Sequence, residues 1–255
     1  MTGPPFLSFT DVSYHAGGRL ILDRVSFEVF RGETLVLLGR SGSGKTTALR
    51  LINRMLEPSS GTIAIDGKNT GDSDAIELRR RIGYVIQEFG LLPHWTVQEN
   101  AALVPRLLGW PAERQAARAK ELLGQVALEE FADRYPNQLS GGQRQRVAVA
   151  RALAAEPLVL LFDEPFGALD PITRHEMQQL FLSVRKQYQG ASVFVTHDVL
   201  EALVLATRIA VLENGRLEGI FTPDEFVNAQ TPVARAFLAA LPDGIIAPKQ
   251  GGGAP

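Results

Sequence analysis

A strand–loop–helix pattern near the start of the chain constrains the fold most. The apolar run TLVLLG, residues 34–39, predicts a strand buried on both faces. The segment GRSGSGKTT, residues 39–47, follows it, and the helical pattern TTALRLINRML comes next. The loop matches the consensus G-x-x-x-x-G-K-S/T in the strand-to-helix context of a phosphate-binding P-loop. The alternative is a Gly/Ser-rich surface loop, which would not need that context.

The residue types in this loop suit a nucleoside triphosphate. Glycines let backbone amides curl around phosphate oxygens without a Cβ clash. Lys45 is expected to place its charge on the β- and γ-phosphates, and the Thr46 hydroxyl to ligate Mg²⁺. We expect the loop to contact the nucleotide through Gly39, Arg40, Ser41, Gly42, Ser43, Gly44, Lys45, Thr46 and Thr47.

Short apolar strands alternate with helical segments along the chain, which predicts an α/β fold with a mostly parallel sheet. The alternating opening segments, FLSFTDVSY and ILDRVSFEV, predict an antiparallel β subdomain at the N-terminus. Residues 88–155 show no strand pattern, and we expect helices at about 97–108, 112–127 and 141–155. Strand patterns resume with LVLLFD, ASVFVTHD, RIAVLENG and RLEGIF. The α-helical subdomain, about 88–155, is thus predicted to be inserted in the core of one domain, 1–240.

Composition excludes some classes of protein. The 255 residues contain no cysteine, so neither disulfides nor thiol chemistry are expected. A net charge of −2 gives no reason to expect nucleic acid as a partner. The apolar runs are far shorter than the roughly 20 residues of a membrane span. The segment PKQGGGAP predicts a flexible C-terminal tail over 241–255.

Two acidic residues follow the predicted strand LVLLFD. Asp163 stands at its carboxyl end, the edge at which α/β sheets bind ligands, and is expected to hold the Mg²⁺ that Thr46 ligates. Glu164 projects in a different direction, and we expect it to polarise a water for attack on the γ-phosphate. Without a P-loop, the pair would read as two solvated acids at a strand end.

A second glycine-rich segment, LSGGQ, opens the helix predicted at 141–155. Glycines at a helix N-terminus leave backbone N–H groups bare and directed at an anion. The segment therefore also suits a phosphate, although the P-loop already binds the triphosphate.

The order of these motifs resembles that of the ATP-binding subunits of ABC transporters, over nearly the whole chain. Gln87, which ends the predicted strand RIGYVIQ, resembles the Q-loop glutamine, and LSGGQ resembles the signature motif. Asp163 and Glu164 resemble the Walker B aspartate and the catalytic glutamate. FGALDP, with Asp170, resembles the D-loop, and VTHD places His197 as the switch histidine.

The resemblance implies a P-loop NTPase fold with a RecA-like core, ATP and Mg²⁺ as cofactors, and a head-to-tail homodimer or a heterodimer with a close relative. In that head-to-tail dimer, the signature motif of one subunit is expected to complete the γ-phosphate shell of the ATP bound to the other. It implies integral-membrane permease subunits as partners, a solute-binding protein as an indirect partner, and a place at the cytoplasmic face of the bacterial inner membrane. The implied catalytic residues are Glu164, His197 and Gln87; the implied metal ligands are Thr46, Gln87 and Asp163; the further nucleotide contacts are Tyr14, Ser140, Gly141, Gly142, Gln143 and Asp170.

Three of these residues have alternative interpretations without the family. Tyr14, which is expected to stack on adenine, would otherwise be a half-buried strand tyrosine. Gln87 would be a strand-edge glutamine, and His197 a structural histidine. The ordered set of motifs favours the functional interpretation of each.

Several strings resemble importer subunits for osmoprotectants such as glycine betaine, choline and carnitine, among them LINRMLEPSSGTIAIDGK, LLPHWTV and DPITR. Many relatives carry CBS domains after the ATPase domain. The residues after RLEGIF are too few for such domains, so we expect neither them nor their ionic-strength sensing. Trp95 stands where methionine is expected, in the segment that borders the permease groove. It is a candidate interface anchor or, alternatively, part of the helical core.

Other classes of protein stay open on the motifs alone. These are an importer for another small solute such as an amino acid, an exporter, and an ABC ATPase outside transport. The last class typically carries coiled coils, zinc-binding cysteines or a second cassette, which this chain lacks. A small-molecule kinase would not explain LSGGQ or His197.

Overall fold

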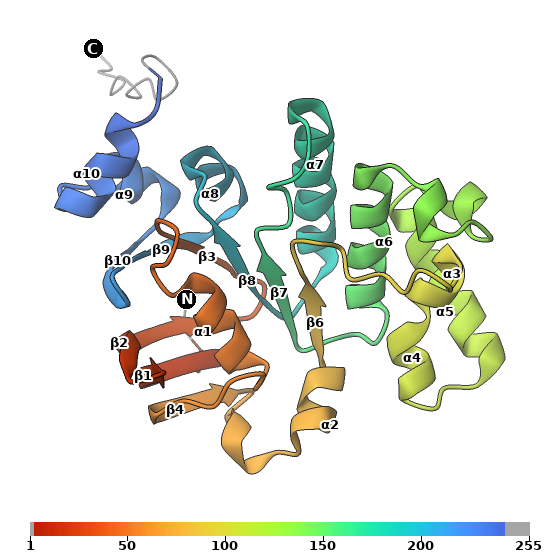
Figure 1. Ribbon diagram of the computed structural model, residues 1–255, viewed down its shortest axis with the longest axis horizontal. Coiled ribbons are helices and arrows are strands. Elements are labelled where there is room, and N and C mark those ends of the chain that lie inside the picture. The colour runs from red at the N-terminus through yellow and green to blue at the C-terminus, as the bar shows by residue number, and fades with distance from the viewer. Residues whose placement is uncertain (1–2, 243–255) are drawn as a thin grey trace.

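The computed structural model describes residues 3–242 and contains two β-sheets (Figure 1). The larger sheet has the strand order β10-β9-β3-β8-β7-β6, and all its pairs are parallel except β10 with β9. Its strands are β3 (Thr34–Leu38), β6 (Ile82–Val85), β7 (Val159–Asp163), β8 (Ala191–Thr196), β9 (Arg208–Glu213) and β10 (Arg216–Phe221). The predicted fold class is confirmed. All but two residues of the tail predicted over 241–255 lie outside the described residues.

The smaller sheet is antiparallel, with the order β2-β1-β4-β5. Its strands are β1 (Leu7–Ala16), β2 (Arg19–Val29), β4 (Ser60–Ile65) and β5 (Lys68–Asn69). It forms the antiparallel β subdomain that the alternating N-terminal segments predict.

Ten α-helices and three short 3-10 helices connect the strands within residues 3–242. The α-helices are α1 (Lys45–Ile52), α2 (Ala75–Arg80), α3 (Val97–Ala101), α4 (Leu103–Leu107), α5 (Ala112–Gln125), α6 (Gly141–Leu153), α7 (Pro171–Gln187), α8 (Val199–Leu205), α9 (Pro223–Val227) and α10 (Pro232–Ala239). The 3-10 helices are η1 (Thr70–Asp72), η2 (Glu129–Phe131) and η3 (Pro136–Gln138). None of the helices in the described part of the chain is long and apolar enough to span a bilayer.

Alternate residues of the central strands divide between two hydrophobic cores, because side chains of a strand point to opposite faces. Leu35 and Leu37 of β3 join the core shared with α1 and the antiparallel sheet. Val36 and Leu38 join the core on the other face, which includes residues of α5, α6 and α7. Both faces of the parallel sheet are therefore covered, as its continuous apolar strands require.

Helices α3 to α6 form a group beside the larger sheet (Figure 1). The helix predicted at 97–108 is wrong as a single helix, since α3 ends at Ala101 and α4 begins at Leu103. Pro105 has no N–H to offer the carbonyl of Ala101, so the helical hydrogen-bond ladder is interrupted there. The predicted strand RIGYVIQ ends at Val85, which leaves Gln87 in the following turn.

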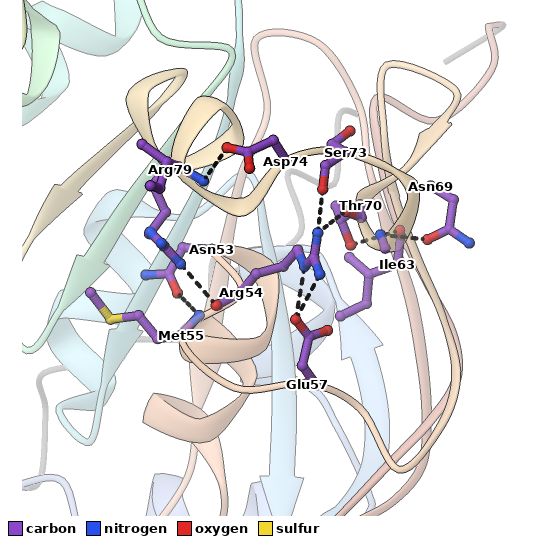
Figure 2. Close-up of polar contacts among 12 residues, drawn as sticks. Asn53, Arg54, Met55, Glu57, Ile63, Asn69, Thr70, Ser73, Asp74 and Arg79 are labelled. Carbon is purple, nitrogen blue, oxygen red and sulfur yellow. Dashed lines mark hydrogen bonds and ion pairs between the residues drawn. The ribbon is translucent and has the colours of Figure 1, made fainter. Parts of the chain in front are cut away.

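The C-terminal end of α1 is joined to η1 and α2 by a polar network around Arg54 (Figure 2). The Arg54 guanidinium donates to the carbonyls of Thr70 and Ser73 and forms an ion pair with Glu57. Arg79 of α2 donates in turn to the Arg54 carbonyl, at 3.1 Å. This network fixes the end of the helix whose other end carries the P-loop.

Candidate functional site

The P-loop lies between β3 and α1 and lines a cavity of about 430 Å³. Gly42 and Gly44 have φ angles of 80° and 102°, in the left-handed region that glycine adopts without strain. A Cβ at Gly44 would also lie 2.5 Å from Cδ2 of Leu22 and 3.2 Å from the Ile21 carbonyl oxygen, so any other residue there would be strained and crowded. Of the nine predicted loop contacts, the cavity is lined by Ser41, Gly42, Gly44, Lys45, Thr46 and Thr47, and not by Gly39, Arg40 or Ser43.

Lys45 is buried at the start of α1, with 4% of its surface exposed. Its Nζ donates to the carbonyls of Gly39 and Arg40, at 2.8 and 2.9 Å. Burial lowers the pKa of Lys45, while the carboxylates of Glu164 and Asp163 oppose that shift. The ammonium group is thus held at the loop by its own backbone.

Thr46 and Asp163 meet across 117 positions of sequence, at the carboxyl edge of the sheet. Oγ1 of Thr46 donates to Oδ1 of Asp163 at 2.8 Å. The second oxygen, Oδ2, accepts a hydrogen bond from the Tyr84 hydroxyl at 3.1 Å. The sequence predicted that Thr46 and Asp163 share one Mg²⁺, which requires them to lie close together. It did not indicate Tyr84, because the pairing register of β6 and β7 is not readable from either segment.

The donor set suits a hard cation, since hydroxyl and carboxylate oxygens are the ligands that Mg²⁺ accepts. Within residues 3–242, no three acidic or histidine side chains form a metal site by themselves. Mg²⁺ typically binds through one or two carboxylates and the substrate phosphates, so Thr46 and Asp163 fit that group.

Glu164 follows Asp163 but turns away from the strand. Its φ is 45°, a left-handed conformation that few residues other than glycine adopt, and its N–H donates to the Val195 carbonyl at 3.1 Å. Glu164 lines the P-loop cavity, and its Oε2 lies 3.0 Å from Nδ1 of His197. The backbone therefore brings the predicted base and the predicted switch histidine together.

Gln87 is exposed in the turn after β6 and does not line the P-loop cavity. Its amide group is near Gly167, where an added Cβ would lie 3.9 Å from Nε2 of Gln87. The turns that follow β6 and β7 thus meet at the same edge of the sheet. The metal-binding role of Gln87 stays a prediction.

The LSGGQ segment lies at the start of α6, where Ser140, Gly142 and Gln143, but not Gly141, line a cavity of about 330 Å³. Ser140 caps the helix, with its Oγ accepting from the Gln143 N–H at 3.2 Å. The Gln143 side chain accepts from the Ser140 N–H at 2.9 Å, which completes a capping box. None of the residues that line this cavity also line the P-loop cavity, and strands β6 and β7 separate α1 from α6 in Figure 1.

Asp170 and Tyr14 lie outside the P-loop cavity. Asp170 caps α7 by accepting from the N–H groups of Ile172 and Thr173, both at 3.1 Å. The bonds with Thr173 hold the pKa of Asp170 below its usual value. Tyr14 is half-buried and packs against the core next to the antiparallel sheet. Adenine stacking by Tyr14 stays a prediction.

Five lining residues of the P-loop cavity were missed by the sequence analysis. They are Arg19, Leu20 and Ile21 of β2, and Asn214 and Gly215 of the β9–β10 turn. A close backbone approach joins these segments: the Asp23 N–H donates to the Gly215 carbonyl at 2.8 Å. A Cβ at Gly215 would lie 2.3 Å from the Ile21 carbonyl oxygen. No local sequence signal marks a contact between strands so distant in the chain.

Comparison with known proteins identifies the family to which the chain is similar. Residues 22–167 match the ABC transporter family. The chain is 51% identical over 214 residues to the glycine betaine/carnitine/choline transport ATP-binding protein OpuCA of Bacillus subtilis, covering 84% of this chain and 56% of that protein. It is 52% identical over 208 residues to the osmoprotectant import ATP-binding protein OsmV of Salmonella typhimurium, covering 81% and 54%. The chain thus spans about half the length of these relatives.

Solved structures share the fold. One is an ATP-binding cassette in a dimeric post-hydrolysis state bound to ADP and Pi, with a TM-score of 0.75, 38% identity, and coverage of 85% of this chain and 98% of that one. Another is CbiO1 of Clostridium perfringens, part of the ABC transporter complex CbiONQ, with a TM-score of 0.82, 30% identity, and coverage of 93% and 96%. The motif geometry, the matched residues and these relatives together show that the chain belongs to the ABC transporter family.

Proposed function

We propose that the chain binds ATP with Mg²⁺ and hydrolyses it, as the subunit that energises an importer of osmoprotectants such as glycine betaine, choline or carnitine. One observation carries the catalytic part. The P-loop residues Lys45 and Thr46 and the predicted base Glu164 line one cavity, while Asp163 is bonded to Thr46 at 2.8 Å. These groups lie at or just after the carboxyl ends of β3 and β7, two parallel strands with β8 between them in the sheet.

Each group has a distinct role in the proposed reaction. Lys45 binds the β- and γ-phosphates, and Thr46 and Asp163 would hold Mg²⁺, which neutralises phosphate charge when bound. Glu164 accepts a proton from the attacking water. His197, 3.0 Å from Glu164 Oε2, orients that carboxylate. We further propose that Gln87 contributes a metal or water ligand and that Tyr14 stacks on adenine.

We also propose a dimer, with two copies or this chain and a close relative arranged head to tail. The LSGGQ cavity shares no lining residue with the P-loop cavity, which supports a role for Ser140, Gly142 and Gln143 toward the nucleotide of the partner. ATP held between two surfaces favours the closed dimer through contacts that the open state lacks. The likeness to a cassette solved as a dimer supports this assembly.

Osmoprotectant import is supported by the names of relatives at about 50% identity. The proposed partners are integral-membrane permease subunits and, indirectly, a solute-binding protein. We place the chain at the cytoplasmic face of a bacterial inner membrane. Residues 1–240 would form a single ABC ATPase domain. Trp95 is half-buried and belongs to neither hydrophobic core, and the Arg106 guanidinium lies 4.9 Å from its ring centroid. This placement favours Trp95 as a permease contact over a role in the core.

The catalytic proposal is tested with Glu164→Gln, which keeps the shape of the side chain and removes the carboxylate. ATP turnover by the purified variant should fall by about 100-fold or more, while ATP binding persists. Glu77→Gln is the matched control, because Glu77 is an exposed partner of Arg80 on α2, and its turnover should equal that of wild type. Turnover by Glu164→Gln at the wild-type rate would exclude Glu164 as the base.

The transport proposal is tested separately, in a strain that lacks the gene. Uptake of radiolabelled choline and glycine betaine should be lost and restored by the wild-type chain but not by Glu164→Gln. Unchanged uptake of every quaternary amine would refute the osmoprotectant assignment and leave ATP hydrolysis unaffected.

A further inference from the structure

Two hydroxyl groups from different elements hold the carboxylate of Asp163. Thr46 of α1 donates to Oδ1 at 2.8 Å, and Tyr84 of β6 donates to Oδ2 at 3.1 Å. Asp163 is 8% exposed, so few water molecules compete for these oxygens. Each carboxylate oxygen therefore has a protein donor, and rotation of the carboxylate would break both bonds.

The register of the parallel pair β6–β7 explains why Tyr84 reaches this carboxylate. Tyr84 lies opposite Leu161, and Asp163 follows Leu161 on the same face of β7. Such a diagonal neighbour is roughly 7–8 Å away, within reach of an aromatic side chain with a terminal hydroxyl. Phenylalanine would fill the same space against the core without making the hydrogen bond.

The chemistry of the site keeps Tyr84 a donor. The pKa of a tyrosine hydroxyl is ordinarily about 10, well above neutral pH. The phenol thus stays protonated at neutral pH. A protonated hydroxyl that donates to a carboxylate forms a charge-assisted hydrogen bond, which is stronger than a neutral one.

We propose that Tyr84 is a positioning residue for the metal site, whose hydroxyl holds Oδ2 of Asp163 so that Oδ1 faces Thr46. The proposal rests on the proposed binding of ATP with Mg²⁺ and adds a group that neither the P-loop nor the acidic pair contains. Tyr84 does not line the P-loop cavity, so it acts through Asp163 rather than on the nucleotide. Groups that orient metal ligands typically change metal affinity by 10–100-fold when they are removed.

The test is Tyr84→Phe, which removes one oxygen and keeps the ring. Binding of a non-hydrolysable ATP analogue to the purified chain is measured in EDTA and over a Mg²⁺ titration. The Mg²⁺ concentration that gives half of the affinity gain should rise by about tenfold in the variant. Affinity for the analogue in EDTA should stay at the wild-type value, because the P-loop is unchanged.

Tyr188→Phe is the matched control. Tyr188 also donates from a largely buried hydroxyl, to the Pro157 carbonyl at 3.0 Å, but near the start of β7 rather than its end. It should lose comparable thermal stability and keep the wild-type Mg²⁺ response. The proposal is overturned if Tyr84→Phe has the wild-type Mg²⁺ half-point, or if it loses as much affinity in EDTA as with Mg²⁺. A wild-type chain that bound the analogue without any Mg²⁺ effect would instead refute the proposed function.

Discussion

At the scale of single residues, the two glycines of the LSGGQ segment have different surroundings. A Cβ at Gly142 would lie 2.4 Å from Cγ2 of Thr173 in α7, whereas a Cβ at Gly141 would meet nothing closer than Cδ2 of Leu169 at 3.7 Å. From the sequence, bare amides at a helix N-terminus account for both glycines. In the structure, Gly142 also lets α6 approach α7.

Gly142→Ala should therefore destabilise the fold. Overpacking of this kind costs about 1–3 kcal/mol of the free energy of unfolding, which denaturant titration measures. Gly141→Ala is the matched control and should be neutral, because 3.7 Å is ordinary van der Waals contact. Adding Thr173→Ser to Gly142→Ala removes the clashing methyl group and should recover the loss. Equal effects of the two alanine variants would contradict the packing explanation.

The candidate site was predictable residue by residue only where a motif fixes local geometry. Lys45 and Thr46 follow directly from the P-loop consensus, and both line the cavity. Tyr84 belongs to no motif, and its contact with Asp163 depends on the relative placement of two strands 79 positions apart. A single sequence contains no measure of that register.

At the scale of elements, α1 is fixed at both ends. Its first residue, Lys45, is bonded to the P-loop backbone, and Arg54, just after its last turn, is bonded to the η1–α2 segment (Figure 2). Arg54 has a φ of 53°, the left-handed conformation in which helices commonly end. Glycine would adopt it with less strain but could not supply the guanidinium.

Arg54→Ala should lower the free energy of unfolding by about 2 kcal/mol, because the Thr70 and Ser73 carbonyls lose a charged donor. The ion pair with Glu57 adds little, since Glu57 is 60% exposed. Arg80→Ala breaks the exposed pair with Glu77 and should cost at most about 0.5 kcal/mol. Chemical denaturation of both variants measures these losses in the free energy of unfolding. A loss no larger for Arg54 than for Arg80 would show that the network does not stabilise α1.

At the scale of the whole molecule, the two phosphate-suited segments line separate cavities. In the proposed dimer, each chain would supply a nucleotide site and a further half-site for the nucleotide of its partner. The proposed dimer would explain the two phosphate-suited segments, and it is testable at one residue.

Because Glu164→Gln should bind ATP without hydrolysing it, we expect that variant to accumulate as an ATP-dependent dimer. Ser140→Asp should abolish this dimer. Aspartate caps a helix as well as serine does, so α6 should keep its stability. Its added charge would face the γ-phosphate of the nucleotide on the partner subunit, and like charges in an interface cost several kcal/mol. Light scattering with and without ATP measures the dimer, and ATP titration of the monomer should give an unchanged affinity.

The control for this variant is Thr222→Asp, at the capping box that opens α9. It places the same charge at another helix start and should leave the dimer intact. A dimer that persists in Ser140→Asp would show that LSGGQ serves only as a structural helix cap.

The sequence by itself determined which chemistry this chain carries and where in the chain it stands. The P-loop, the acidic pair and LSGGQ are local patterns, and a local pattern specifies its own backbone geometry through glycine, capping and strand ends. Only the tertiary structure decided which separate segments meet. It paired Tyr84 with Asp163, brought Thr173 against Gly142, and added Gly215 to the P-loop cavity. Those contacts depend on strand register and helix approach, which are set by the packing of the two cores and not by any one segment.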